Sequence, residues 1–402
     1  MKKILISTLM TTCAVGLLTA QSGVVVFDGA RVIVGDGKTI DNAVIVMQNG
    51  RFTQVGPAAA VKAPGGATRV SLAGKTVMPT INDTHVHTST TEAELVTDLQ
   101  RRARFGIGAA LSMGLDGNDV AFVQRGKIVP SMARIFTAGR GITAPEKGRT
   151  EVPYWITTAD EGRKAVRELA AKQVDIVKIW VDDRDGKFPK LTPALYSAVI
   201  DEAHKNQLRV TAHIFSLEDA KGLLKAGIDS FAHGIRDRDL DDELIALVKA
   251  RPNFVLIPNM PDRGVVADYS WLRGQITDAE LAKIQAGATD RPQAHQAWAI
   301  QGRNLAKMSA AGVIITVGTD GNTPWAPHVE MADMVAAGMT PAQVIVSATK
   351  NGAEFLRIKD AGTIANGMSA DFLVLDANPL DDITNTRKIS RVYLRGAEVS
   401  RQ

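Results

Sequence analysis

The first part of the chain alternates short apolar, β-branched runs with turn-forming dipeptides. Apolar runs at residues 24–27 and 43–47 lead into the turn pairs 28–29 and 49–50, which read Asp-Gly and Asn-Gly. Because Asn, Asp and Gly accept positive φ, such pairs favour tight hairpins. Residues 362–396 repeat this pattern of short apolar runs and turn-forming residues. Neither segment alone has enough strands to bury a sheet face, so the pattern predicts a small β-sandwich built jointly from residues 21–76 and 357–402.

Between these segments, over residues 77–356, strand-like apolar runs alternate with helical patterns. Helices are expected to start at Thr158, where Glu161 completes a capping box, and at Thr192, Ser216 and Thr340. This alternation predicts a parallel sheet with crossover helices. Strands are expected at residues 77–87, 107–112, 133–137, 174–181, 209–214, 230–233, 254–258 and 313–320. The pattern therefore predicts an α/β fold of the (β/α)8 barrel type, with long loops at residues 115–130 and 139–155.

Two histidines end the first of these apolar runs. His85 and His87 are separated by one residue, and positions i and i+2 of a strand point to the same face. The two imidazoles can therefore share one cation. For an isolated His-X-His pair, an exposed or hydrogen-bonded couple is the simpler explanation. Whether this pair is interpreted as a metal site therefore depends on the remainder of the chain.

Four further polar residues lie at or near the ends of later apolar runs, where barrel enzymes carry their active-site groups. They are Lys178, His213, His233 and Asp320. Taken singly, each has a structural explanation: a lysine that reaches past a helix, a hydrogen-bonded core histidine, or an aspartate that forms a turn with the glycine after it. However, alternation along the strand places Lys178 on the face of Ile176 and Trp180, where a free ammonium would be costly to bury. The ordered set favours a metal site.

With these residues in place, the chain resembles the amidohydrolase superfamily, in particular its imidazolonepropionase-like and prolidase-like branch. The resemblance rests on the ordered His-X-His, Lys, His, His and Asp and covers nearly the whole chain after its first twenty residues. It implies two divalent metal ions, commonly zinc, bridged by a hydroxide and by a lysine that CO2 has carboxylated. The matching lysine is Lys178. Imidazole and carboxylate ligands also suit manganese, cobalt and nickel.

The resemblance also implies a role for each residue of the set. The first metal would be held by His85, His87 and Asp320, and the second by His213 and His233. Asp320 would in addition act as the general base and acid. Around strand five the chain departs from many prolidase-like relatives, because residues 213–216 read His-Ile-Phe-Ser instead of His-Ala-His-Gly. The ligands are intact, but this departure puts Xaa-Pro dipeptidase activity in doubt.

Substrate contacts are less distinct in the sequence. Arg140 follows the third expected strand and could pair with a substrate carboxylate, although a surface salt bridge explains it equally well. Tyr154 and Trp325 could wall an apolar pocket, but large aromatic residues are buried structurally just as often. The remaining histidines stay outside the metal set: we expect His204 on an exposed helix face, and His328 in a loop.

Three classes of function follow. The leading one is a metal-dependent amidohydrolase that uses a metal-bridging hydroxide to cleave an amide bond in a small, peptide-like or N-acyl amino acid substrate. The second uses the same site on an ester, lactone or organophosphate. The third is a non-catalytic binding scaffold, against which retention of all six residues argues.

Composition and charge set the remaining bounds. The 402 residues are 45% hydrophobic and 22% charged, with a formal net charge of +4 and no basic run, so nucleic acid is not an expected partner. Residues 1–20 read as a secretory signal that is cleaved after Ala20, with an uncleaved anchor as the alternative. We therefore expect a periplasmic or secreted protein without a membrane segment. The single cysteine, Cys13, lies in that signal, which excludes disulfides and cysteine catalysis in the mature chain. A homo-oligomer is compatible with these bounds.

Overall fold

The computed structural model describes residues 23–401. The expected signal segment and Cys13 lie outside these residues. Within the described part, no helix combines the length and hydropathy needed to cross a bilayer.

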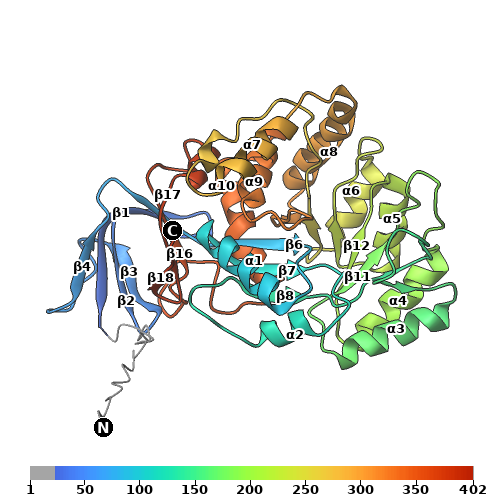
Figure 1. Ribbon diagram of the computed structural model, residues 1–402, viewed down its shortest axis with the longest axis horizontal. Coiled ribbons are helices and arrows are strands. Elements are labelled where there is room, and N and C mark those ends of the chain that lie inside the picture. The colour runs from blue at the N-terminus through green and yellow to red at the C-terminus, as the bar shows by residue number, and fades with distance from the viewer. Residues whose placement is uncertain (1–22, 402) are drawn as a thin grey trace, which may run out of the picture.

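Both ends of the chain build one hydrogen-bonded sheet, at the left of Figure 1. Its order is β18-β17-β16-β5-β1-β2-β3, and β4 pairs with β1. The strands are β1 (Val25–Ile33), β2 (Thr39–Gln48), β3 (Arg51–Pro57), β4 (Thr68–Ser71), β5 (Thr76–Pro79), β16 (Phe372–Leu375), β17 (Ile389–Leu394) and β18 (Ala397–Glu398).

This sheet curls onto itself. Phe52 of β3 and Phe372 of β16 lie 5.7 Å apart between ring centroids, although β2, β1 and β5 separate their strands in the sheet. The backbone N–H of Phe52 also donates to the carbonyl of Met368, at 3.0 Å. Phe27 and Tyr393 fill the enclosed face, with ring centroids 5.3 Å apart. The segments at the two ends of the chain therefore share one aromatic core, within a continuous curled sheet.

The middle of the chain forms two parallel sheets. A three-stranded sheet has the order β6-β7-β8, and a seven-stranded sheet has the order β10-β9-β11-β12-β13-β14-β15. The strands are β6 (Ile81–Val86), β7 (Ile107–Ser112), β8 (Arg134–Thr137), β9 (Ile142–Thr143), β10 (Tyr154–Trp155), β11 (Val177–Trp180), β12 (Val210–His213), β13 (Ser230–Ala232), β14 (Val255–Ile257) and β15 (Ile314–Ile315).

Backbone hydrogen bonds join the two parallel sheets on both sides. The N–H of Asp175 donates to the carbonyl of Thr137 at 2.9 Å, and that of Thr84 donates to Val317 at 2.8 Å. β15 is shorter than the expected strand over residues 313–320 and ends at Ile315. The following residues still run beside β6, because the N–H of Thr319 donates to the carbonyl of His85 at 3.0 Å.

Helices lie between most of these strands and cover the outer face of the sheets (Figure 1). They are α1 (Glu92–Arg104), α2 (Val120–Arg125), α3 (Ala159–Ala171), α4 (Pro193–Lys205), α5 (Leu217–Ala226), α6 (Asp242–Lys249), α7 (Asp278–Gly287), α8 (Pro292–Ala310), α9 (Ala326–Ala336), α10 (Pro341–Val346) and α11 (Gly352–Phe355). Shorter turns are η1 (Ser270–Leu272), η2 (Ser347–Asn351) and η3 (Ile383–Arg387).

The expected helix starts are confirmed. Thr158 and Glu161 form the capping box that begins α3, and α4, α5 and α10 begin after Thr192, Ser216 and Thr340. The two long loops were incompletely predicted. Residues 115–130 contain α2, and residues 139–155 contain β9 and β10. These elements are only six and two residues long, too short for periodicity to reveal.

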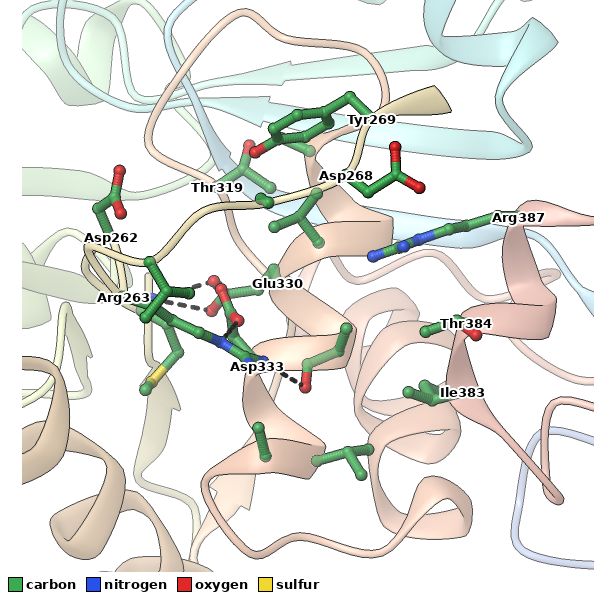
Figure 2. A pocket seen from close by; sticks show the side chains of 18 of the residues that line it. Asp262, Arg263, Asp268, Tyr269, Thr319, Glu330, Asp333, Ile383, Thr384 and Arg387 are labelled. Atoms are coloured by element: carbon green, nitrogen blue, oxygen red, sulfur yellow. Dashed lines mark hydrogen bonds and ion pairs between the residues drawn. The ribbon is translucent and has the colours of Figure 1, made fainter. Parts of the chain in front are cut away.

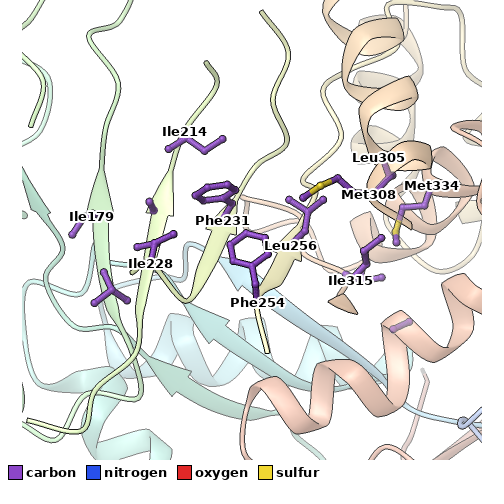
Figure 3. Close-up of a cluster of buried hydrophobic side chains, with 14 of the residues drawn as sticks. Ile179, Ile214, Ile228, Phe231, Phe254, Leu256, Leu305, Met308, Ile315 and Met334 are labelled. Atoms are coloured by element: carbon purple, nitrogen blue, oxygen red, sulfur yellow. The ribbon is translucent and has the colours of Figure 1, made fainter. Parts of the chain in front are cut away.

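The main core lies between the parallel strands and their helices. Figure 3 shows side chains of successive strands, including Ile179, Phe231 and Leu256, and Met308 of α8. These positions alternate with residues on the opposite strand face, such as Lys178. Burial of the outer face against helices therefore directs Lys178 and its equivalents inward.

Candidate metal centre

The six residues of the expected set come together from five strands. His85 lies in β6, Lys178 in β11 and His213 at the end of β12, whereas His87, His233 and Asp320 follow β6, β13 and β15. Parallel pairing sets His213 beside Trp180 on one side and beside Ala232 on the other. Because parallel strands end at the same edge, residues that lie far apart in sequence converge there.

The closest contacts centre on Asp320. Its Oδ1 lies 3.0 Å from Nε2 of His85 and 3.0 Å from Nε2 of His87, and its Oδ2 lies 3.5 Å from Nε2 of His233. Nζ of Lys178 lies 3.4 Å from Nε2 of His85. His85, His233 and Asp320 offer ligand atoms within 4.8 Å of one another. The structure thus gathers mutually close ligand atoms without any adjustment.

His213 is placed differently. Its ring lies 4.4 Å from that of His233, but its Nε2 faces Oδ2 of Asp182 and Nη1 of Arg184, each at 3.0 Å. Arg184 is itself held by Glu146, whose Oε1 lies 3.1 Å from Nε of Arg184. His213 is therefore at the centre, with its outward nitrogen engaged by the loop that follows β11.

Three backbone positions at the centre are strained. His233, Asn259 and Asp320 have φ values of 85°, 43° and 55°, in the left-handed region that non-glycine residues rarely adopt. Each such residue costs about 1–3 kcal/mol and persists only where the surrounding structure enforces it. They follow the consecutive strands β13, β14 and β15, where the chain turns into the centre.

Gly318 explains how the last strand approaches the first. A Cβ at this position would lie 2.4 Å from Cγ2 of Ile257 and 2.9 Å from Cβ of His85. Any side chain would therefore push the segment carrying Asp320 away from His85.

Burial controls the protonation of the histidines. Burial and then the charge of Lys178 lower the pKa of His85 to about 4. Burial likewise holds the pKa values of His213 and His233 well below their usual range. All three imidazoles are consequently neutral at neutral pH, which is the form that binds a metal ion.

Lys178 and Asp320 are shifted as well. Burial lowers the pKa of Lys178 to about 7, against the opposing attraction of Asp320. Burial raises the pKa of Asp320, but its interactions with His85, His87 and His233 outweigh burial and hold the pKa of this carboxyl well below its usual range. The centre therefore contains an ionised carboxylate and an amine with a substantial neutral fraction at neutral pH.

The donor set fits a divalent cation. Among the described residues, Nε2 of His233 is buried without a hydrogen-bond partner. Nδ1 of His85 lies 2.9 Å from Oδ1 of Asn259. The neutral His85 ring carries a single proton, so it can donate to Asn259 or to Asp320, 3.0 Å from Nε2, but not to both, and one of its nitrogens then faces an acceptor without a proton between them. Two facing acceptors repel each other unless a cation lies between them, as ligation would provide.

Sequence reasoning missed Asn259, Asp182 and Arg184. Asn259 lies two residues after β14, as other site residues follow their strands, so its position was a usable signal. Asp182 and Arg184 lie in a polar loop after β11, and nothing in that loop's pattern distinguishes them from solvated residues.

The residues expected to contact substrate lie in two places. Cζ of Arg140 lies 4.0 Å from the ring of Tyr154, and the Arg140 side chain donates to the carbonyl of Val152. Trp325 is buried, with its ring 5.6 Å from that of Phe105. These contacts give Arg140 a partner other than a surface carboxylate and place Trp325 in a separate apolar cluster.

The prediction that His328 lies in a loop is wrong. This residue lies in α9 and is buried, with Nδ1 at 3.0 Å from Oγ1 of Thr386 and Nε2 at 2.9 Å from the carbonyl of Phe105. The proline before it occupies the first turn of α9, where its missing N–H is tolerated. His204 lies on α4 as expected, where its Nε2 is 2.9 Å from Asp229.

Comparison with known proteins identifies the family of this chain. The amidohydrolase family profile matches residues 76–399, so the chain belongs to the amidohydrolase family, as its sequence suggested. Membership in this family implies a TIM-like barrel. Amidohydrolases as a class act on C–N bonds and typically bind metal ions.

Individual relatives are more distant. The chain is 27% identical to an ochratoxinase of Aspergillus niger over 297 residues, covering 69% of this chain but 55% of that protein, just over half its length. It is 25% identical over 391 residues to an imidazolonepropionase of Deinococcus radiodurans, covering 91% and 94% of the two chains. A solved structure of a protein assigned as a prolidase from Bifidobacterium longum superposes with a TM-score of 0.78 at 27% identity, covering 94% of this chain and 95% of that one.

Proposed function

We propose that this protein is a metal-dependent amidohydrolase that cleaves an amide bond in a small, peptide-like or N-acyl amino acid substrate. The observation that carries this proposal is the convergence of His85, His87, Lys178, His233 and Asp320, with His213 beside them. Its family membership supports the same class of reaction.

The two parallel sheets act in this proposal as one closed (β/α)8 barrel made of β6, β7, β8 and β11–β15. The backbone hydrogen bonds at Thr137 and Thr84 support closure. We assign residues 77–356 to this barrel, and residues 21–76 and 357–402 to the composite β domain. The barrel then directs its strand ends, and with them the ligands, to one mouth.

In the proposed site, His85, His87 and Asp320 would hold one divalent ion, His213 and His233 would hold a second, and Lys178, carboxylated by CO2, would contribute an anionic ligand shared by the two. Zinc suits these ligands, and manganese, cobalt or nickel can replace it. When bound, such ions supply Lewis-acid polarisation of the carbonyl and a water of lowered pKa.

The protein's own residues perform the remaining work. Asp320 is the residue positioned to take the proton of the attacking water and deliver it to the leaving nitrogen. Its side chain is 37% exposed, whereas those of His85 and Lys178 are fully buried, so substrate approaches from the Asp320 side. Asn259 orients His85 through its Nδ1. Arg184 and Asp182 hold His213, so its ligation requires this loop to give up a contact.

The decisive experiment combines elemental analysis with a hydrolysis screen. Purified protein, reconstituted with metal and bicarbonate, should contain two divalent ions per chain and hydrolyse members of an N-acyl amino acid panel, and chelator should abolish the activity. Ester and amide versions of one acyl group distinguish amide cleavage from the ester, lactone or organophosphate alternative. A stoichiometry of one refutes the binuclear centre, and metal-replete protein that is inactive on the whole panel points to a binding scaffold.

Export is a separate part of the proposal. Residues 1–20 act as a cleaved signal, which places the mature enzyme in the periplasm or outside the cell. N-terminal sequencing of exported protein should begin near Gln21, and a sequence beginning at Met1 would refute cleavage.

A further inference from the structure

A cavity lies beside the metal centre and is not lined by any of its six residues. It has a volume of about 590 Å³ and lies between the segment after β14, helix α9 and η3 (Figure 2). Thr319 forms part of its wall, next to Asp320. This volume falls within the range of small-molecule sites.

The acidic groups of the cavity wall already have donors. Asp333 pairs with Arg263, and Asp262 pairs with Arg291. The remaining two accept backbone hydrogen bonds, since Glu330 accepts from the N–H of Met260 at 3.0 Å and Asp268 accepts from that of Ser270 at 2.8 Å. The wall therefore offers little unpaired negative charge to an additional cation.

Arg387 is the exception among the charged residues of the wall. Within residues 23–401 it has no carboxylate oxygen within 4.0 Å, and its Nε is buried without a hydrogen-bond partner. Its one protein hydrogen bond is long, from Nη2 to the carbonyl of His328 at 3.4 Å. The guanidinium lies 4.7 Å from the ring of Trp271 and points into the cavity toward α9 (Figure 2).

Asp333 and Asp382 act on Arg387 only from beyond direct pairing distance, so this partly buried guanidinium still has donors free for an anion. Arginine offers parallel N–H donors that match a carboxylate in a bidentate arrangement, and its charge is permanent. Burial strengthens such an ion pair relative to one in open solvent.

The rest of the wall is suited to an apolar body. Met260, Tyr269 and Trp271 line the interior, and Val265 and Val266 lie at the rim with 44% and 71% of their surface exposed. Exposed valines beside a cavity leave apolar surface that a ligand can cover.

We propose that this cavity is a binding site, distinct from the metal centre, for a small organic carboxylate with an aromatic or branched aliphatic body. Arg387 binds the carboxylate, and Trp271 and the two valines contact the body. The site does not depend on bound metal and goes beyond the proposed hydrolase activity.

Calorimetric titration of the full chain with phenylacetate tests the site, and the neutral phenethyl alcohol serves as the comparison ligand. Phenylacetate should bind with the same affinity to chelator-treated and metal-loaded protein, and phenethyl alcohol should bind about tenfold to a hundredfold more weakly. Arg387→Gln should weaken phenylacetate binding by a similar factor. Arg303→Gln, on the exposed face of α8 and paired with Asp239, is the matched control and should leave binding unchanged.

The exposed rim offers a second pair of variants, whose substitutions should leave folding intact. Val266→Asp places a negative charge at the mouth and should weaken phenylacetate several-fold relative to the neutral Val266→Asn, with no such difference for phenethyl alcohol. If Arg387→Gln does not fold by circular dichroism, this pair decides the question.

Three outcomes overturn the proposal: no saturable phenylacetate binding, binding that disappears with chelator, or binding that neither Arg387→Gln nor the Val266 pair alters. The second places the anion at the metal centre. None of these outcomes bears on whether the metal-loaded protein hydrolyses amides, so the two proposals fail separately.

Discussion

Burial of His328 predicts a measurable loss of stability in acid. Burial lowers the pKa of His328 to about 4 from its usual 6.5, and only 1% of the residue is exposed. The unfolded chain therefore binds a proton at this position more tightly than the folded chain does. The stability contribution is fully present above about pH 6.5 and is lost as the pH falls through about 4.

The size of the effect follows from the two pKa values. A difference of about 2.5 pH units corresponds to a limit of about 3.4 kcal/mol below pH 4, at about 1.36 kcal/mol per unit. Between about pH 7.5 and pH 5 the free energy of unfolding should fall by about 2 kcal/mol on account of His328 alone. His328→Gln removes the titration but can retain a donor toward the carbonyl of Phe105, so its cost should not depend on pH.

The assay is urea unfolding of chelator-treated wild type and His328→Gln at both pH values, with circular dichroism and tryptophan fluorescence as two probes. Other buried histidines contribute to both proteins and cancel in the comparison. The variant should be the less stable protein near pH 7.5 because it packs imperfectly, and the gap should narrow by about 2 kcal/mol near pH 5. An unchanged gap would refute the assignment of His328 as a neutral, buried group.

Three further predictions concern the centre and its support. Lys178→Ala should lose most hydrolytic activity and at least one metal ion, and acetate or propionate should restore part of the activity. Lys178→Arg should stay inactive, whereas the control His204→Ala should keep nearly all activity. Full activity with two bound metals in Lys178→Ala would show that this lysine is structural. Asp320→Asn should lower kcat by about a hundredfold or more, measured on the best substrate of the screen, because it removes the proton carrier; a wild-type kcat would exclude that role. Arg102→Met should lower the free energy of unfolding by about 3–5 kcal/mol in urea, because it leaves Asp83 buried and ionised 3.1 Å from where Nη1 of Arg102 had been; a change below about 1 kcal/mol would show that Asp83 becomes neutral at little cost.

Local patterns in the sequence determined the order and kind of most elements. The alternation of strands and helices, the capping box at Thr158 and the turn pairs near both ends depend on residues a few positions apart, so they can be read from the chain. The same is true of His85 and His87, which share a strand face because of the two-residue period of the backbone. Family resemblance then ordered the remaining ligands along the chain.

Only the tertiary structure decided which groups support those ligands. Asn259 meets His85 across 174 positions, and Arg184 reaches His213 across 29, through contacts that no local pattern encodes. His328 shows the same limit, since whether a histidine near a proline faces solvent or fills a core depends on Phe105 and Thr386, which are distant in sequence. Periodicity reports which face of an element is buried, but the partner that buries it, and the charge left unpaired in a cavity, depend on long-range packing.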